Sequence, residues 1–397
     1  MKDMGKSRQI SVGLDVGTYT TRVVACELAT GGIYPKILGT GSSETKGVRH
    51  GYVTNISEAS KSILKAIQEV EKNSGVKIKK AIIAIGGISL SSEISYGSAV
   101  ISKSDGEVTY LDVNKALVDS ESNLQIINKK ILHSIPVSYR LDAKDIHGRP
   151  EGMKGIKLEV KTLHITCLEQ HMEDLITATS QAGIEVADVV ATPLAISTVA
   201  LTDRQKIAGC VLVDIGAETV SIAVFENGAT VSLHVFSIGS TDITNDIALG
   251  LKIPLEEAEG LKIGVQTQNG YSRKKLDQII EARLKDVFEL IDSHLRRIRR
   301  SGLLPAGVII TGGGSNIVMI EEISREVLKL PTKVLTIDLM PMYKNKVKNS
   351  SWLVPIGLCA TSSGENSIES ATSGISLRRA YYGIKNTLQN IGKQLLP

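Results

Sequence analysis

Apolar residues along the chain occur in short continuous runs and at helical spacing, a mixture typical of an α/β protein. The first apolar run, residues 10–14, leads into the tetrapeptide Asp-Val-Gly-Thr (15–18), and a β-branched run follows at 21–28. Together they predict a β-hairpin. The same arrangement returns about 200 residues later, where runs at 209–214 and 220–225 flank a second Asp-x-Gly turn. The two hairpins indicate an internal duplication.

The remaining apolar pattern predicts the elements between and after these hairpins. The stretch 57–72 places Ile63, Ile67 and Val70 on one helical face, with Ser57 as the N-cap. We predict further helices at 169–182, 193–201 and 276–298, and strands at 80–85, 186–190 and 307–311.

The region 85–165 has a different rhythm. It combines strand-like alternation at 91–102 and 157–166 with one helical stretch at 111–124. This pattern predicts a small α+β subdomain inserted into the larger α/β chain.

Composition narrows the class of protein. The chain has 397 residues, 42% hydrophobic and 22% charged, which indicates a globular protein too long for one ordinary core. Its four cysteines stand far apart, which excludes a zinc ribbon or disulfide framework and fits a reducing compartment. No apolar run approaches the roughly 20 residues of a membrane span, and no secretory signal is evident, so we expect a cytoplasmic protein.

Nucleic-acid binding is disfavoured by the same composition. The net charge is only +4 and aromatic residues make up 4% of the chain. One basic run, HLRRIRR at 294–300, lies within a predicted helix and is better explained as a solvated helix end or a filament contact.

Three glycine turns carry the candidate chemistry. The third, Gly-Gly-Gly-Ser at 312–315, follows an apolar strand and is expected to lead into a helix N-terminus. Such turns offer free backbone N–H groups without side-chain bulk, and Asp15 and Asp214 stand at strand ends where they could hold Mg²⁺ through water. One Asp-x-Gly turn alone is usually just a hairpin, but the combination predicts a nucleotide clamped between two lobes. A P-loop and a dinucleotide fingerprint are both missing.

The sequence around these turns resembles a known superfamily. LDVGTYTTRVV, GCVLVDIGAETVSIAVF and GVIITGGGSNI resemble the phosphate-1, phosphate-2 and adenosine motifs of the actin, heat-shock chaperone and sugar-kinase ATPases, over residues 10 to about 360. The resemblance implies a two-lobed actin-like (ASKHA) α/β fold that binds ATP and Mg²⁺. The ATP contacts that it implies in the three turns are Asp15, Gly17, Thr18, Tyr19, Thr20, Asp214, Gly216, Glu218, Thr219, Gly312, Gly313, Gly314 and Ser315.

Further segments resemble the FtsA family. ILHSIPVSYRLD and KLEVKTLHITC look like parts of its inserted subdomain, and SIGSTDITNDIALGLKIPLEEAEGLKI looks like the segment after its second phosphate motif. This implies that Gly239 contacts phosphates and that Glu259 and Lys262 contact the adenosine. Without the resemblance, Glu259 and Lys262 would be interpreted as an exposed ion pair three residues apart.

The resemblance also implies a domain organisation. Lobe I would comprise 1–84, 166–200 and 345–360; the insert, 85–165; and lobe II, 201–344. Small polar residues at 361–375 separately predict a flexible linker, which would connect the lobes to a C-terminal amphipathic helix, 376–397.

Three departures from the superfamily pattern bear on catalysis. Thr192 stands where readily hydrolysing members have a Glu or Gln, and a threonine cannot serve as a carboxylate base. The first turn of the superfamily often carries a Lys near the position of Thr20, and here Arg22 is the closest cation. In the second turn, Ala217 and Glu218 stand where Gly is usual. We therefore expect ATP binding with slow hydrolysis at most, and whether the protein is an enzyme is left open.

The tail has the pattern of a membrane-surface helix. Its apolar residues recur at spacings of four and three, and its only charges are basic, which is typical of a helix lying in the membrane interface. The alternative is a helix docked on the protein's own core. The residues expected to contact an anionic membrane are Leu377, Arg378, Arg379, Tyr381, Ile384, Lys385, Leu388, Ile391, Lys393 and Leu395.

The FtsA resemblance implies a cell-division adaptor at the inner face of the membrane. Its implied partners are the FtsZ C-terminal tail, bound through the second lobe, further copies of itself in a filament, and later division proteins bound through the insert. An actin-like pilus-assembly adaptor is one alternative, and a sugar or acetate kinase of the same fold is a less favoured one.

Overall fold

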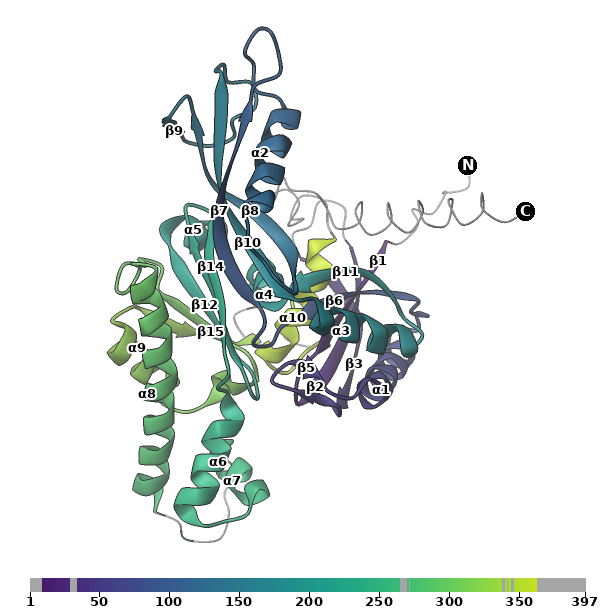
Figure 1. The fold of residues 1–397 in the computed structure, drawn as a ribbon. Helices are drawn as coiled ribbons and strands as arrows, with labels where there is room; N and C mark the ends of the chain where they lie inside the picture. Colours follow the sequence, from purple (N-terminus) through teal and green to yellow (C-terminus); the bar gives the residue numbers. More distant parts are fainter. Residues whose placement is uncertain are drawn as a thin grey trace, which may run out of the picture. The chain divides into compact units, whose positions relative to one another are not determined.

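The computed structural model describes residues 9–28, 34–264, 270, 272–337, 340, 342–343 and 346–362. They form two compact units (Figure 1). The first unit comprises the described residues up to Ser91 and those from Leu168 onward, and the second comprises Ser92–Cys167. The predicted tail helix, 376–397, lies outside the described residues, as does the predicted linker apart from its first two positions.

The first unit contains a five-stranded sheet in the order β11-β6-β1-β2-β3. The predicted N-terminal hairpin is confirmed: β1 and β2 pair antiparallel, with Asp15 opposite Arg22. The strand β3 continues the meander antiparallel to β2, while β6 pairs parallel to β1 and β11 parallel to β6. The bounds are β1 Ile10–Val16, β2 Thr20–Glu27, β3 Lys36–Glu44, β6 Lys80–Ile85 and β11 Glu185–Ala191.

A second set of strands in the same unit repeats this topology. In the order β16-β15-β12-β13-β14, strands β12, β13 and β14 form an antiparallel meander, β15 pairs parallel to β12, and β16 parallel to β15. Strand for strand this matches β11-β6-β1-β2-β3, which supports the predicted duplication. The bounds are β12 Cys210–Ile215, β13 Val220–Glu226, β14 Ala229–Phe236, β15 Val308–Thr311 and β16 Thr332–Val334.

Helices cover both sheets. Helix α1 packs on β2 and β3, and α10 packs on β1, β2 and β6. Helix α4 contacts β6 and β11 of the first sheet and β12 and β13 of the second, so it joins the two. The helices of this unit are α1 Ile56–Ser74, α3 Glu169–Gln181, α4 Thr192–Ala200, α5 Asp203–Ala208, α6 Ser240–Leu251, α7 Leu255–Lys262, α8 Arg273–Arg297, α9 Ile320–Leu328 and α10 Leu353–Thr361.

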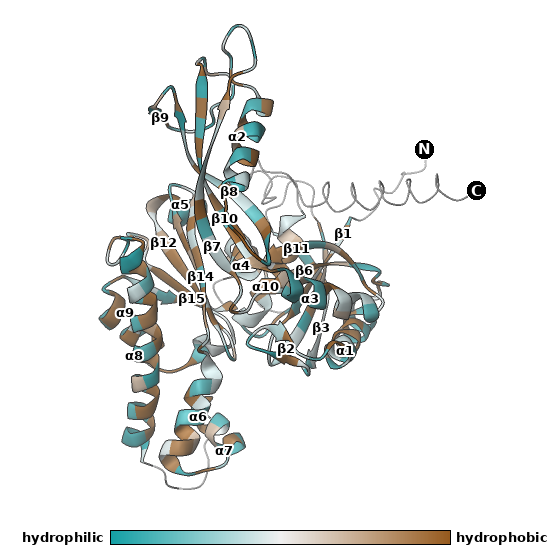
Figure 2. Ribbon diagram, in the orientation of Figure 1, coloured by the Kyte–Doolittle hydropathy of each residue, from teal (hydrophilic) through white to brown (hydrophobic). Residues whose placement is uncertain are grey.

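Helix α8, the longest among the described residues, is held in place by its predicted apolar stripe. Ile280, Leu284, Val287 and Ile291 are all buried, in a cluster that includes residues of β12, β13 and β15. Figure 2 shows hydrophobic and hydrophilic positions interspersed along α8. The strands β12 and β13 are buried along nearly their whole length, which explains why their sequences are continuous apolar runs rather than alternating ones.

The predicted start of the first helix is wrong by two residues. Helix α1 begins after Asn55, whose side-chain oxygen accepts a hydrogen bond from the Glu58 N–H at 3.1 Å. Ser57 instead lies inside the first turn and is exposed. The predicted apolar face is confirmed, because Ile63, Ile67 and Val70 are buried.

The second unit is a small α+β fold, in agreement with the sequence pattern. Its strands lie in the order β7-β10-β8-β9, and α2 packs its Val113, Ala116 and Leu117 into a core shared with Leu158 and Val160. The long strand β8 escaped prediction because His133, Ser134 and Pro136 interrupt its apolar alternation. The elements are β7 Ser91–Val100, α2 Tyr110–Ser122, β8 Lys129–Leu141, β9 Lys144–Ile146 and β10 Lys157–Leu168.

Candidate functional site

The two duplicated turns are closed in the same way. A Cβ on Gly17 would lie 2.9 Å from the Thr20 carbonyl oxygen, and one on Gly216 would lie 3.0 Å from the Thr219 carbonyl oxygen. Gly216 N–H also donates to that Thr219 oxygen at 2.9 Å. Glycine therefore allows the chain to fold back tightly at both turns, which leaves the backbone at each tip uncovered by a side chain of its own.

The carboxylates of the two turns are half-buried, and both interact electrostatically with one guanidinium. Burial raises the pKa of Asp15 to about 6, against the opposing effect of Arg22. Burial, together with the charge of Asp15, raises the pKa of Asp214 to about 7. Arg22 interacts electrostatically with both carboxylates and lies 5.9 Å above the Trp352 ring. Two acids that disfavour each other's ionisation are suited to a divalent cation, which favours both charges.

The third turn packs directly on the second. Gly312 has a φ of 95°, and a Cβ there would lie 2.4 Å from Asp214 Oδ1 and 2.5 Å from the Ile215 carbonyl oxygen. Gly314 is equally constrained, because its Cβ would lie 2.6 Å from Ile215 Cγ2. A Cβ on Gly313, by contrast, would meet nothing within 4 Å. Gly313 is therefore the position in this turn where a ligand could approach the backbone.

The helix expected directly after this turn is absent. Residues Gly313–Asn316 form a single 3₁₀ turn, and the α-helix that follows, α9, begins only at Ile320. Ser315 is buried, and its hydroxyl donates to the Gly312 carbonyl at 2.8 Å. A long helix dipole therefore does not act at this turn, and Ser315 has a structural role in closing it.

Gly239 and α7 adjoin the second turn. A Cβ on Gly239 would lie 2.3 Å from the Ala217 carbonyl oxygen, so the start of α6 lies backbone to backbone with the turn. Lys262 Nζ contacts Glu259 Oε2 at 2.7 Å and donates to the Ser240 carbonyl at 3.1 Å and to Thr244 Oγ1 at 2.8 Å. The Lys262 side chain is only 7% exposed, against 43% for Glu259. Glu259 Oε2 also accepts from Thr244 Oγ1 at 2.5 Å, so the pair anchors α7 on α6 while Glu259 stays partly exposed.

The donor set fits a magnesium ion only if a ligand supplies most of the oxygens. Within the described part of the chain, no group of three His, Cys, Asp or Glu side chains could hold a metal. Asp15 and Asp214 offer carboxylate oxygens, which Mg²⁺ prefers, and phosphate oxygens and water would complete its coordination.

Comparison with known proteins decides the family. The family model described as cell division protein FtsA matches residues 211–357, and that of the SHS2 domain inserted in FtsA matches residues 87–166. The cell division protein FtsA of Pseudomonas aeruginosa is 29% identical over 374 residues, 89% of each chain. That of Bacillus subtilis is 28% identical over 373 residues, which cover 89% of this chain and 83% of the relative. The chain belongs to the FtsA family of cell division proteins.

Solved structures agree with the actin-like fold of FtsA. A chain of the PilM–PilN type IV pilus biogenesis complex matches with a TM-score of 0.64, covering 90% of this chain and 98% of the other at 15% identity. The MreB5 protein of Spiroplasma citri, solved bound to ADP, matches with a TM-score of 0.52, covering 92% and 99% at 13% identity. The predicted fold class is confirmed, and the match at residues 87–166 confirms its FtsA-type insert.

Glu218 lies in an unexpected environment for this FtsA-family chain. Its side chain is buried, and its Oε1 contacts Arg49 Nη1 at 2.8 Å while its Oε2 accepts from the His50 N–H at 2.7 Å. Arg49 therefore neutralises a carboxylate that would otherwise repel phosphates. Sequence reasoning missed this hairpin of β4 Val48–Arg49 and β5 Tyr52–Val53, because its strands have two residues each and His-Gly is not one of the usual hairpin turn pairs.

The remaining predicted contacts divide into engaged and open residues. Thr18 Oγ1 accepts from the Gly51 N–H at 3.1 Å, whereas the Tyr19 side chain is 72% exposed. Thr20 opens β2 and Thr219 directly precedes β13, so both stand where their hairpins begin to return.

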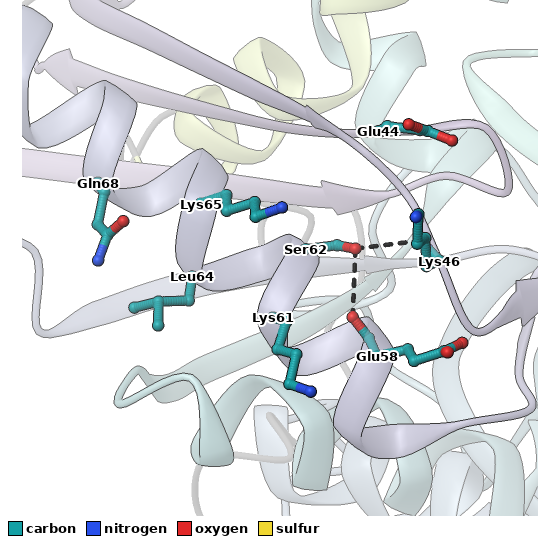
Figure 3. Close-up of a pocket in the computed structure, with 8 residues that line it drawn as sticks. All are labelled: Glu44, Lys46, Glu58, Lys61, Ser62, Leu64, Lys65 and Gln68. Atoms are coloured by element: carbon teal, nitrogen blue, oxygen red, sulfur yellow. Dashed lines mark hydrogen bonds between the residues drawn. The ribbon is translucent and has the colours of Figure 1, made fainter.

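Two other charged features lie outside the turns. The basic run 294–300 ends α8, where Arg296 contacts Asp292 at 2.7 Å and Arg300 contacts Glu226 at 2.6 Å, as expected of a helix end. A groove of about 560 Å³ lies along α1 and β3. Figure 3 shows the residues that line it: Glu44, Lys46, Glu58, Lys61, Ser62, Leu64, Lys65 and Gln68. Its Ser62 hydroxyl is bonded within the protein, to Lys46 N–H and the Glu58 carbonyl.

Proposed function

We propose that this FtsA-family protein is an ATP-binding, self-associating adaptor that tethers FtsZ filaments to the inner face of the cell membrane at the division site. In this proposal it also recruits later division proteins. The observation that carries the nucleotide part is the packing of the third turn and Gly239 onto the second turn, with the half-buried Asp15 and Asp214 close enough for their charges to interact.

The residues divide the work of holding MgATP. The backbone N–H groups of Gly313 and of the two hairpin turns, apart from the bonded one of Gly216, would donate to phosphate oxygens, and Asp15 and Asp214 would hold Mg²⁺ through water. Bound Mg²⁺ supplies positive charge that offsets the carboxylates and the phosphates together. Glu259, partly exposed on α7, is the group that we assign to the adenosine, with Lys262 and Thr244 fixing its position.

Thr192 favours a switch over a rapid ATPase. It is the first residue of α4 and is buried, and its Oγ1 lies 3.2 Å from the place of a Cβ on Gly86. A threonine hydroxyl does not accept a proton from water at neutral pH, so this position lacks a general base. We infer slow hydrolysis, in which nucleotide state changes much more slowly than in a metabolic kinase.

Attachment to the membrane rests on the sequence of residues 376–397. Within the described part of the chain, no helix is long and apolar enough to cross a bilayer. Four tail cations would contribute about 1 kcal/mol each at an anionic surface, so one copy would bind weakly. A filament that presents many tails would bind through avidity, which couples self-association to membrane attachment.

The pilus-adaptor alternative has one observation in its favour, the fold match to a chain of the PilM–PilN complex. The curated relatives over 89% of the chain are instead named cell division proteins, and the insert matches the FtsA model. A kinase would need rapid transfer to a small acceptor, and both the lack of an evident acceptor-base motif and the presence of the insert disfavour it.

Sedimentation with liposomes tests the adaptor role. FtsZ of the same organism, the full-length protein and anionic vesicles are centrifuged together, with a variant truncated after residue 374 as the control. We expect FtsZ in the pellet only with the full-length protein, because the tail attaches the complex to lipid. If the full-length protein pellets and FtsZ does not, the division role is wrong; if the protein itself never pellets, the membrane role is wrong.

A further inference from the structure

The short turn Arg49–Tyr52, which we name the clasp, joins β4 to β5. It contacts both Asp-x-Gly turns, residues 15–18 and 214–219, which we call the phosphate turns. His50 has a φ of 48° and Gly51 a φ of 80°. Two successive residues with positive φ fold the backbone as a tight hairpin turn. The N–H groups of His50 and Gly51 consequently both have partners outside their own hairpin.

Those partners belong to the two phosphate turns. The Gly51 N–H donates to Thr18 Oγ1 in the first turn, at 3.1 Å. The His50 N–H donates to Glu218 Oε2 in the second turn, at 2.7 Å, and His50 Nδ1 lies 3.3 Å from the Glu218 carbonyl oxygen. Arg49 adds its guanidinium to the same carboxylate. A shift of either phosphate turn must therefore move the clasp or break these bonds.

The other side of the clasp contacts the chain where it enters the inserted unit. A Cβ on Gly51 would lie 2.5 Å from Gly87 Cα, so the two backbones touch, and this loop leads through Ser89 into β7. His171, at the start of α3 just after the chain leaves the insert, contacts the Gly51 carbonyl through Nε2 at 2.8 Å.

One imidazole completes this connection. Since a carbonyl only accepts, His171 Nε2 carries the proton, and Nδ1 then accepts from the Ser89 hydroxyl at 2.8 Å. The Tyr52 ring stacks on the same imidazole at 4.4 Å. The clasp is therefore bonded to the phosphate turns on one side and to both flanks of the insert, Ser89 and His171, on the other.

We propose that the clasp reports nucleotide occupancy of the phosphate turns to the two chain segments that flank the insert, with Glu218 as the positioning residue. This inference rests on the proposed nucleotide site. If the clasp had only a structural role, its hydrogen bonds would be equally stable with and without nucleotide. If it transmits nucleotide occupancy, the stability of these bonds changes when nucleotide binds.

Hydrogen exchange of the full-length protein tests the proposal, with and without MgATP at a concentration that saturates each variant. Peptides covering 212–220, 47–54 and the flanks 86–91 and 169–176 are followed. In the wild type we expect slower exchange in all of them. In Glu218→Ala the protection of 212–220 should remain and that of both flanks should be lost. Glu218→Gln, which keeps an oxygen for the His50 N–H, should restore part of the flank protection.

Glu226→Ala is the matched control, since Glu226 lies at the other end of β13 in a similar pair with Arg300 at 2.6 Å. It should behave as the wild type. His171→Phe keeps a ring beside Tyr52 but removes both bonds, so it should lose flank protection while the clasp stays protected.

Two results would contradict the proposed role of the clasp. One is full flank protection in Glu218→Ala, and the other is protected phosphate turns in the wild type without any change at the flanks. If MgATP slows exchange in no segment of the wild type, the proposed nucleotide site is wrong, and so is the proposed role of the clasp, which depends on it.

Discussion

Asp214 is the residue on which the candidate site converges. It stands opposite Thr311 on β15 and Ser221 on β13, and Gly312 packs against its Oδ1. Its charge is disfavoured by burial and by Asp15. Without a cation, ionisation of Asp214 therefore destabilises the folded state, and bound Mg²⁺ would offset that destabilisation.

A pH dependence follows from this residue. Its pKa is about 7 in the folded chain and 3.8 when unfolded, so the stability it contributes is present at low pH and lost as pH rises through 7. Asp214→Asn, which mimics the neutral acid, should make the nucleotide-free protein more stable than the wild type at pH 8, by roughly 1–2 kcal/mol, and equal to it near pH 4. Denaturant unfolding at both pH values measures this. The same difference in free energy of unfolding between the two proteins at both pH values would contradict the raised pKa of Asp214.

At the scale of elements, the start of α1 offers a direct test. Asn55→Ala removes the oxygen that accepts from the Glu58 N–H, and should lower the free energy of unfolding by about 1 kcal/mol. Ser57→Ala, at the cap expected from sequence, should change it by less than about 0.5 kcal/mol because Ser57 is exposed. Equal losses in the two variants would refute Asn55 as the cap.

Elements with strong periodicity could be predicted from sequence, and those with short or interrupted patterns could not. The strand β6 and the buried stripe of α8 follow from apolar spacing alone. The strand β8 did not, because Pro136 and two polar residues break its alternation. The clasp was missed since β4 and β5 have two residues each, and the turn after Thr311 was predicted wrongly as a helix start because three glycines and a serine also begin many helices.

Some site geometry depends on contacts that no local pattern contains. The spacing of Glu259 and Lys262 predicts an ordinary exposed pair, yet Lys262 is buried by bonds to Ser240 and Thr244 on another helix. Likewise, the cationic partner of Glu218 is Arg49, far away in the sequence. Resemblance located these residues, but only the fold gives their partners.

At the scale of the whole molecule, duplication explains why three turns meet. Each half supplies a hairpin with an Asp-x-Gly turn, and the parallel strand beside the second hairpin, β15, brings the Gly312–Ser315 turn to Asp214. The two halves thereby place backbone donors and two carboxylates in one unit of the protein. That arrangement is the central claim of this account, since the adaptor's switching depends on the nucleotide it holds.

Calorimetric titration of MgATP into the full-length protein tests this claim most directly. The wild type should bind, and Asp15→Asn and Asp214→Asn should each weaken binding by about 30-fold or more, since loss of a charged partner costs about 2 kcal/mol. Asp277→Asn, which only breaks an exposed pair with Arg273 on α8, should bind as the wild type does. Unchanged MgATP affinity in both Asp15→Asn and Asp214→Asn would contradict the nucleotide site.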